Sequence, residues 1–220
     1  DILCLTEALF LQMCQKIFSK KSITKKPFPR LTYKEAVEKY KTDKPDLRKN
    51  KNSPEELAWC WVVDFPLFEW KEQEDRFDAM HHPFTAPKDK DVTDLLAKKN
   101  LGKLQAKQYD LVLNGHEVAG GSIRIVDPKA LSAVFEIMGH TPQKIKEKFG
   151  HLLQAFQFGV PPHGGIALGL DRILMVLQNE SSLREVIAFP MTASGRTAVM
   201  EAPSTADPNQ LKELRIKIEN

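Results

Sequence analysis

The sequence is poor in cysteine and has no long hydrophobic run, and both absences limit what the protein can be. Only Cys4, Cys14 and Cys60 occur in 220 residues, and no two of them form a CxxC pair. An odd number leaves one cysteine unpaired, which favours a reducing, intracellular location. No apolar stretch approaches the ~20 residues of a membrane span, and no signal-peptide pattern opens the chain. We therefore expect a cytoplasmic protein without a membrane segment.

Common nucleotide-binding and zinc-binding motifs are missing as well. There is no HExxH and no GxGxxG after a strand pattern. Gly164 to Gly169 has the glycine spacing of a P-loop, but Leu170-Asp171 follows where a P-loop requires Lys followed by Ser or Thr. These absences argue against a zinc protease, a Rossmann dinucleotide site and a P-loop enzyme.

Length and composition are those of an ordinary globular protein. The chain is 42% hydrophobic and 28% charged, and 220 residues suit one domain with at most a small appendage. The net charge is only +3, but residues 1–51 carry 13 Lys and Arg against 6 Asp and Glu. A basic N-terminal quarter suits an RNA backbone and suits a solvated lysine-rich surface equally well.

The strongest local pattern is a predicted β-hairpin with its turn at Asn114-Gly115. The residues before the turn alternate, and both turn residues tolerate positive φ, which is typical of a two-residue hairpin. In that register Val112 faces Glu117 and Asp110 faces Ala119. Asp110 and Glu117 then share a face as diagonal neighbours, about 7 Å apart.

A glycine pair, Gly120-Gly121, follows in the second strand and predicts a bulge. One bulge shifts the alternation by one residue, so Arg124 rejoins the face of Asp110 and Glu117. Two carboxylates and a guanidinium then lie on one sheet surface with bare backbone between them. The alternative is a solvated hairpin face with one surface ion pair, which is typical of charged hairpins.

A second informative stretch runs from Gly164 to Leu177. Ile166–Leu168 is predicted to be a buried strand, and an apolar helix face follows from Asp171. Arg172 stands at this strand-to-helix junction beside glycines, a position suited to binding an anion with a planar donor fork. A helix-start arginine paired with a nearby carboxylate is an equal alternative.

These two runs together, YDLVLNGHEVAGGSIR and GLDR, resemble the active-site strands and third signature motif of bacterial-type aspartyl-tRNA synthetase, a class II aminoacyl-tRNA synthetase. Further matching segments are TDKPDLR (42–48), MHHPFT (80–85), VIAFP (186–190) and EAPS (201–204). The resemblance covers nearly the whole chain from about Thr6. It implies an α+β fold in which helices flank an antiparallel β-sheet, as part of a class II catalytic core.

The resemblance also implies roles for the hairpin residues. Asp110 and Glu117 resemble carboxylates that hold Mg²⁺ and ATP, and Arg124 resembles the arginine that pairs with the side chain of the substrate L-aspartate. The implied reaction joins aspartate and ATP as aspartyl-adenylate and then charges tRNA. Glu117, Arg124 and Arg172 are its implied catalytic groups.

The remaining implied site residues lie in the other two motifs. Arg172 resembles the arginine that binds ATP, and Gly169 and Asp171 belong to the same motif. His81 and His82 resemble histidines that line the aspartate pocket. From the residues alone, neighbours on a strand point to opposite faces, which favours one buried and one exposed histidine.

The chain departs from the family pattern in three places. Ala119 stands where relatives usually have a third glycine. Residues 49–56 form only a short linker, between residues 1–48 and 57–220, where relatives carry an inserted domain that is here absent, excised or left out. The first two class II motifs and the anticodon-binding barrel lie upstream in the family, so we expect a fragment of a longer, homodimeric enzyme.

Two other functions stay open. One is a non-catalytic class II paralogue that serves as a binding or regulatory module. The other is a related enzyme that activates asparagine or lysine, for which we would not expect an arginine at position 124.

The remaining patterns predict flanking helices and strands. Helices are expected from a stripe of Leu5, Leu9, Met13 and Ile17, after a Thr32–Glu35 capping box, over 91–99, over 128–137, in two pieces over 142–158 and over 209–218, and strands over 59–66 and 77–85.

Overall fold

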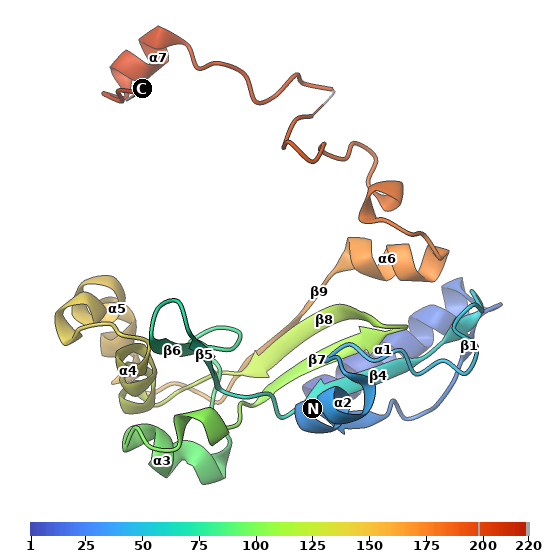
Figure 1. The fold of residues 1–220 in the computed structure, drawn as a ribbon, viewed down its shortest axis with the longest axis horizontal. Helices are drawn as coiled ribbons and strands as arrows, with labels where there is room; N and C mark the ends of the chain where they lie inside the picture. The colour runs from blue at the N-terminus through green and yellow to red at the C-terminus, as the bar shows by residue number, and fades with distance from the viewer. Residues whose placement is uncertain (198, 219–220) are drawn as a thin grey trace.

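The computed structural model describes residues 1–197 and 199–218 and is built on a five-stranded sheet (Figure 1). The strand order is β2-β4-β7-β8-β9, and only the β2–β4 pair is parallel. The strands are β2 (Arg30–Thr32), β4 (Trp59–Val63), β7 (Gln108–Leu113), β8 (His116–Ile123) and β9 (Gly164–Leu168). The predicted α+β fold with an antiparallel sheet is confirmed.

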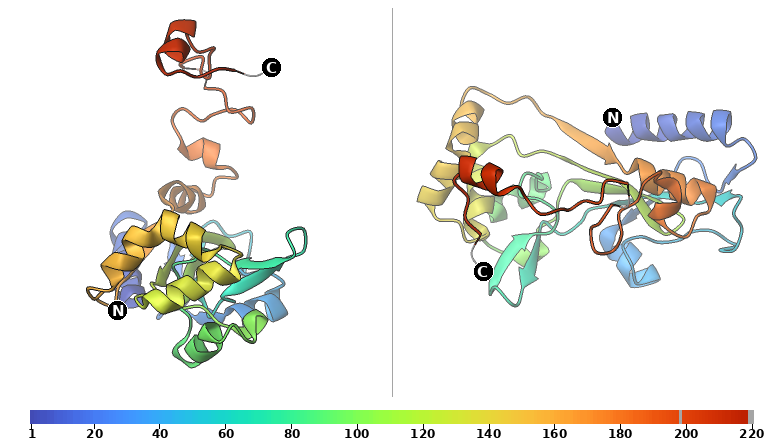
Figure 2. Two further views of the ribbon diagram at one scale, coloured as in Figure 1. Left: turned by 90° about the vertical axis from the view of Figure 1, so that its left-hand side faces the viewer. Right: turned by 90° about the horizontal axis from the view of Figure 1, so that it is seen from above.

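Helices and two small sheets surround this sheet. The helices are α1 (Ile2–Ile17), α2 (Tyr33–Tyr40), α3 (Val92–Leu96), α4 (Pro128–Ile137), α5 (Pro142–Phe156), α6 (Leu170–Gln178) and α7 (Pro208–Glu213); the short strands are β1 (Ser22–Ile23) with β3 (Glu56–Leu57), and β5 (Phe68–Lys71) with β6 (Arg76–Ala79). Helices α3 to α5 gather at one end of the sheet (Figure 1), and after α6 the chain leaves the body (Figure 2). In the described residues, no helix is long and apolar enough to cross a membrane.

Helix starts follow the capping signals in the sequence. Thr32 and Glu35 form the predicted capping box of α2, and Asp127 and Thr141 cap α4 and α5 through their side chains. The prediction of two helical pieces after Thr141 is wrong, because α5 continues through Gly150 to Phe156. The last helix is also shorter than predicted and ends at Glu213.

The core lies on both faces of the sheet because the strands alternate. On one face Trp59 and Trp61 pack with Phe10 of α1, and on the other Cys60 packs with Ala36 of α2. The predicted stripe of α1 is not its buried face: Leu5, Leu9 and Ile17 are exposed, whereas Thr6, Glu7, Phe10 and Cys14 are buried.

Three predicted strands differ from the structure, and the one predicted over 59–66 ends at Val63 as β4. β9 is not buried, because in the part of the chain that the structure describes it pairs only with β8, and Leu168 is 43% exposed. The strand predicted over 77–85 ends at Ala79, and a turn carries the chain past His81 and His82.

The central hairpin has the predicted turn but a different irregularity. Val112 faces Glu117 as expected, whereas the register shifts at Val118 and Asp110 faces Gly120 rather than Ala119. The predicted bulge at Gly120-Gly121 is therefore wrong. The second glycine is instead required by close packing, since a Cβ on Gly121 would overlap the backbone of β9.

Candidate active site on one face of the sheet

The site is centred on two carboxylates that flank a glycine. Asp110 lies on β7 and is buried, and Glu117 lies at the start of β8. A Cβ built on Gly120 would lie 3.1 Å from Oδ1 of Asp110 and 3.5 Å from Oε1 of Glu117. Both carboxylates thus point over the bare backbone of Gly120, and the prediction that they share a face is confirmed.

Burial and mutual repulsion perturb this carboxylate pair. The pKa of Asp110 is raised to about 7, first by burial and then by the negative charge of Glu117. The Nε2 of Gln108 donates to Oδ1 of Asp110 at 3.4 Å, which opposes this shift. A pair that resists full ionisation in this way favours a bound cation.

One cation from a distant loop already reaches the pair. Lys44 lies in the loop that joins α2 to β3, and its Nζ is 3.3 Å from Oε2 of Glu117. We did not predict this residue, although the segment TDKPDLR, which contains it, was noted for its resemblance. The only available signal was that motif, because nothing in local spacing connects Lys44 to Glu117, which lies 73 positions later.

Arg124 lies on the same face, directly after the last residue of β8, where it forms an isolated bridge with Thr85. After the register shift, Gly120, Ser122 and Arg124 occupy alternate positions, and Ser122 and Arg124 both contact His82. Nη1 of Arg124 lies 2.5 Å from Nε2 of His82, while the Phe84 amide donates to Nδ1 at 3.2 Å. The predicted common face of Arg124 and the carboxylate pair is confirmed.

The surroundings of Arg124 leave it without a carboxylate partner. No salt bridge to Arg124 occurs among the described residues, and its Nε and Nη2 have no hydrogen-bond acceptor there. Burial, with the nearby charges of Arg124 and His81, lowers the pKa of His82 to about 4, so this ring is neutral at pH 7. The free side of the Arg124 fork can therefore take an external anion.

A cavity of about 560 Å³ opens beside the carboxylate pair. Its lining includes His81, Glu117, Gly120, Gly169, Asp171 and Arg172. Nη1 of Arg172 donates to the backbone oxygen of Glu117 at 2.7 Å, and in the described residues it forms no salt bridge with a carboxylate. The cavity thus joins Gly169, Asp171 and Arg172 to the hairpin.

The other predicted site residues lie outside the cavity lining. Asp110 adjoins it through Gly120, whereas His82 and Arg124 form a second group just beyond the end of β8. The His81 and His82 rings are 5.2 Å apart and connect the two groups, because the turn after β6 places both histidines at the site. Buried Ser122 and Gln108, which pair across the strands on this face, were not predicted.

The donor set suits Mg²⁺ rather than a metal held by protein alone. Mg²⁺ in phosphate-transferring sites is bound by one or two carboxylates together with substrate phosphates and waters. Among the described residues no cluster of three or more His, Cys, Asp or Glu could hold a metal ion. Asp110 and Glu117 over Gly120 supply two carboxylates and space, which fits a metal shared with a phosphate.

The chain matches one known enzyme family over most of its length. The family model of class II tRNA synthetases (D, K and N) matches residues 1–193. The chain belongs to this family. Its sequence is similar to the aspartate–tRNA(Asp/Asn) ligase of Dictyoglomus turgidum, with 54% identity over 169 residues, and to the aspartate–tRNA ligase of Bacteroides fragilis, with 50% identity over 163 residues.

The match covers most of this chain but little of its class II relatives. These alignments span 77% and 74% of the chain, and 28% of each relative. The fold is similar to that of aspartyl-tRNA synthetase from Entamoeba histolytica, with a TM-score of 0.60 and 21% identity over 87% of this chain and 40% of that one. Asparaginyl-tRNA synthetase from Pyrococcus horikoshii gives 0.59 and 18% identity, over 88% and 46%. These two structures support the class II fold alone.

Proposed function

We propose that this chain is part of the catalytic domain of an aspartate–tRNA ligase, which activates L-aspartate with ATP and transfers it to tRNA. The observation that carries the proposal is the common face of Asp110, Glu117 and Arg124, beside the cavity that contains Arg172. The curated relatives at about half identity, named for this reaction, support it.

Arg124 is proposed to bind the side-chain carboxylate of aspartate. Its free donors match the two oxygens of a carboxylate. The ring of His82 contacts the guanidinium and, because it is neutral, does not neutralise the positive charge of Arg124. Asparagine would place an amide donor against a guanidinium donor, which disfavours it. His81, at the cavity edge, is proposed to line the same pocket.

The cavity is proposed to take ATP. Arg172, at the start of α6, faces it with Gly169 and Asp171, where a guanidinium can bind an anionic or planar group. Asp110 and Glu117 would hold Mg²⁺, which when bound neutralises phosphate charge. Lys44 offsets part of the negative charge of Glu117, which lowers the repulsion between that carboxylate and a phosphate.

The proposed partners follow from this function. They are aspartate-accepting tRNA and a second copy of the intact enzyme, in the cytoplasm. A non-catalytic class II paralogue, or an enzyme for asparagine or lysine, would share the fold but not the same substrate response.

ATP–pyrophosphate exchange by the full-length protein that carries this chain tests the proposal. We expect exchange with aspartate and none with asparagine or lysine. Arg124→Lys should reduce aspartate activation by about 2–3 kcal/mol, roughly 30- to 150-fold, because a point charge replaces a two-pronged donor.

The control is Arg30→Lys, at an exposed β2 residue whose side chain forms no hydrogen bond or salt bridge with the described residues, and it should leave activation unchanged. No exchange with any amino acid would favour the non-catalytic paralogue, and exchange with asparagine or lysine would identify the related enzyme.

A further inference from the structure

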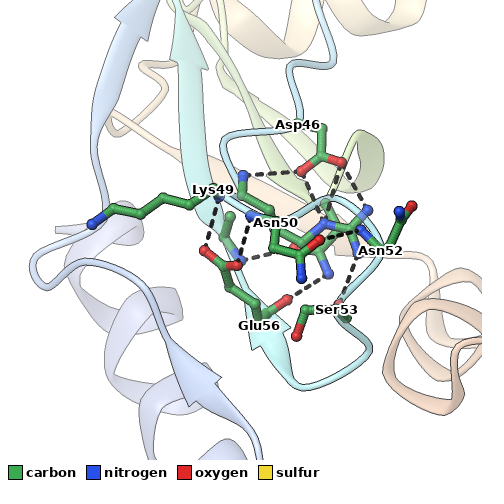
Figure 3. Close-up of polar contacts among 9 residues, drawn as sticks. Asp46, Lys49, Asn50, Asn52, Ser53 and Glu56 are labelled. Carbon is green, nitrogen blue, oxygen red and sulfur yellow. Dashed lines mark hydrogen bonds and ion pairs between the residues drawn. The ribbon is translucent and has the colours of Figure 1, made fainter.

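The linker of residues 49–56, between α2 and β3, is closed by its own hydrogen bonds (Figure 3). The carboxylate of Glu56 accepts from the backbone N–H groups of Lys49 and Asn50, at 3.0 and 3.2 Å. The side chain of Asn50 accepts from the Asn52 amide at 3.1 Å. One acidic side chain therefore joins the two ends of a turn that would otherwise be a loose surface loop.

The residues just before the linker are held by a bidentate contact between Arg48 and Asp46. Arg48 binds Asp46 through two donors, Nε to Oδ1 at 3.0 Å and Nη2 to Oδ2 at 2.7 Å. Its third donor, Nη1, reaches the backbone oxygen of Ser53 at 3.1 Å, inside the linker. The Asp46 and Arg48 side chains are only 16% and 13% exposed, so this contact is better shielded than a surface ion pair.

The closed linker is also hydrogen-bonded to the central hairpin, which is formed by β7 and β8. Asn114, in the hairpin turn, donates to the backbone oxygen of Glu56 at 2.9 Å and accepts from the Ala58 amide at 2.8 Å. Next to it, a Cβ on Gly115 would lie 3.4 Å from Cβ of Asp46. The loop before the linker is thus packed directly on the turn that precedes Glu117.

Lys44 lies close to these contacts in the sequence. It is two residues before Asp46, and its ammonium pairs with Glu117, three residues after Asn114. We propose that Glu56 and Arg48 are positioning residues, which hold the loop so that Lys44 stays at the Glu117 carboxylate. The importance of this for catalysis rests on the proposed function, whereas the positioning itself does not.

Chemical labelling of Lys44 tests the positioning without any assay of activity. Lysine acetylation by a small reagent, followed residue by residue with mass spectrometry, is compared in the 220-residue chain and its Glu56→Gln variant. An amide can accept from only one of the two N–H groups and presents a donor to the other, so the turn should open. We expect Lys44 to react about fivefold faster, while Lys34, in its own pair with Glu38 on α2, reacts at the same rate.

The matched control is Glu55→Gln, the same change one residue earlier, where the carboxylate is exposed and has no hydrogen bond among the described contacts. Arg48→Lys, which keeps the charge but loses the fork, should act like Glu56→Gln. Unchanged Lys44 labelling in both Glu56→Gln and Arg48→Lys would overturn the proposal.

A double-mutant cycle in the full-length protein separates positioning from general stability. Glu56→Gln should lower aspartate-dependent pyrophosphate exchange about fivefold, but less than twofold when Lys44 is already alanine. An equal loss in both backgrounds would mean that Glu56 does not act through Lys44, and would overturn the proposal. Absence of exchange in the unmodified protein would refute the proposed function, with the labelling result still deciding the positioning.

Discussion

Asp110 and Glu117 face each other across the bare backbone of Gly120, within a sheet whose opposite face is filled by tryptophan and leucine. The core therefore fixes the strands, and Gly120 leaves open the position beside both carboxylates that a Cβ would otherwise occupy. Gly120 is not in a left-handed conformation, so its backbone does not require a glycine. The absence of a side chain instead leaves room for the two carboxylates.

Gly120→Ala should weaken Mg²⁺ binding without unfolding the chain. The new methyl group would lie 3.1 Å from Oδ1 of Asp110, so the carboxylates must separate. We expect roughly tenfold weaker Mg²⁺ binding in the presence of ATP, measured by calorimetry on the full-length protein. Gly102→Ala, where a Cβ meets nothing within 4 Å, is the control. Equal Mg²⁺ affinity in both variants would contradict this account of Gly120.

Asp110→Asn should stabilise the chain and more so at high pH. The pKa of Asp110 is about 7 in the native state and about 3.9 when unfolded, so the native state binds more protons between these values and stability falls as pH rises to 7. Asparagine does not ionise, so the variant does not lose stability in this way as the pH rises. In urea unfolding without Mg²⁺, the gain should be larger at pH 8 than at pH 5 by roughly 2 kcal/mol. An equal gain at both pH values would show that Asp110 ionises without penalty.

Local signals in the sequence were enough to predict the hairpin and most helix starts. Asn114-Gly115 has only one common hairpin geometry, and the Thr32–Glu35 capping box satisfies its donors within four residues. The face shared by Asp110, Glu117 and Arg124 was predicted although the bulge was misplaced. A single register shift between Glu117 and Arg124 places Arg124 on the face of the two carboxylates, wherever in this segment it occurs. A shift at Val118 therefore gives the same result as the predicted bulge at Gly120-Gly121.

Features that depend on distant contacts were not predicted. Lys44 reaches Glu117 only because the linker packs on the hairpin turn, and no periodicity encodes that contact. The exposure of β9 and of Leu5 and Leu9 on α1 was missed for a related reason. An apolar pattern reports that a face is suited to burial, and it does not report which segment covers it.

His82→Gln should change how stability depends on pH. The pKa of His82 is about 4 in the native chain, whereas an unfolded histidine titrates near about 6.5. Between these values the unfolded state binds more protons, so the free energy of unfolding decreases as pH falls from 6.5 to 4. Glutamine does not titrate, and the slope in urea unfolding over this range should become flatter. Identical slopes in the two proteins would mean that His82 protonates normally in the folded chain.

The 220-residue chain alone should not form aspartyl-adenylate at a useful rate. Its cavity is bounded by β8, β9 and α6, while the other edge of β9 is unpaired among the described strands and Leu168 and Leu170 are exposed beside it. The rate gained by positioning reactants is lost when one side of a site does not hold them in place. An open strand edge with apolar neighbours also promotes association between chains. The measurement is pyrophosphate exchange with aspartate, ATP and Mg²⁺, after circular dichroism has confirmed folding. Turnover within about tenfold of the full-length protein would mean that Asp110, Glu117, Arg124 and Arg172 suffice for activation.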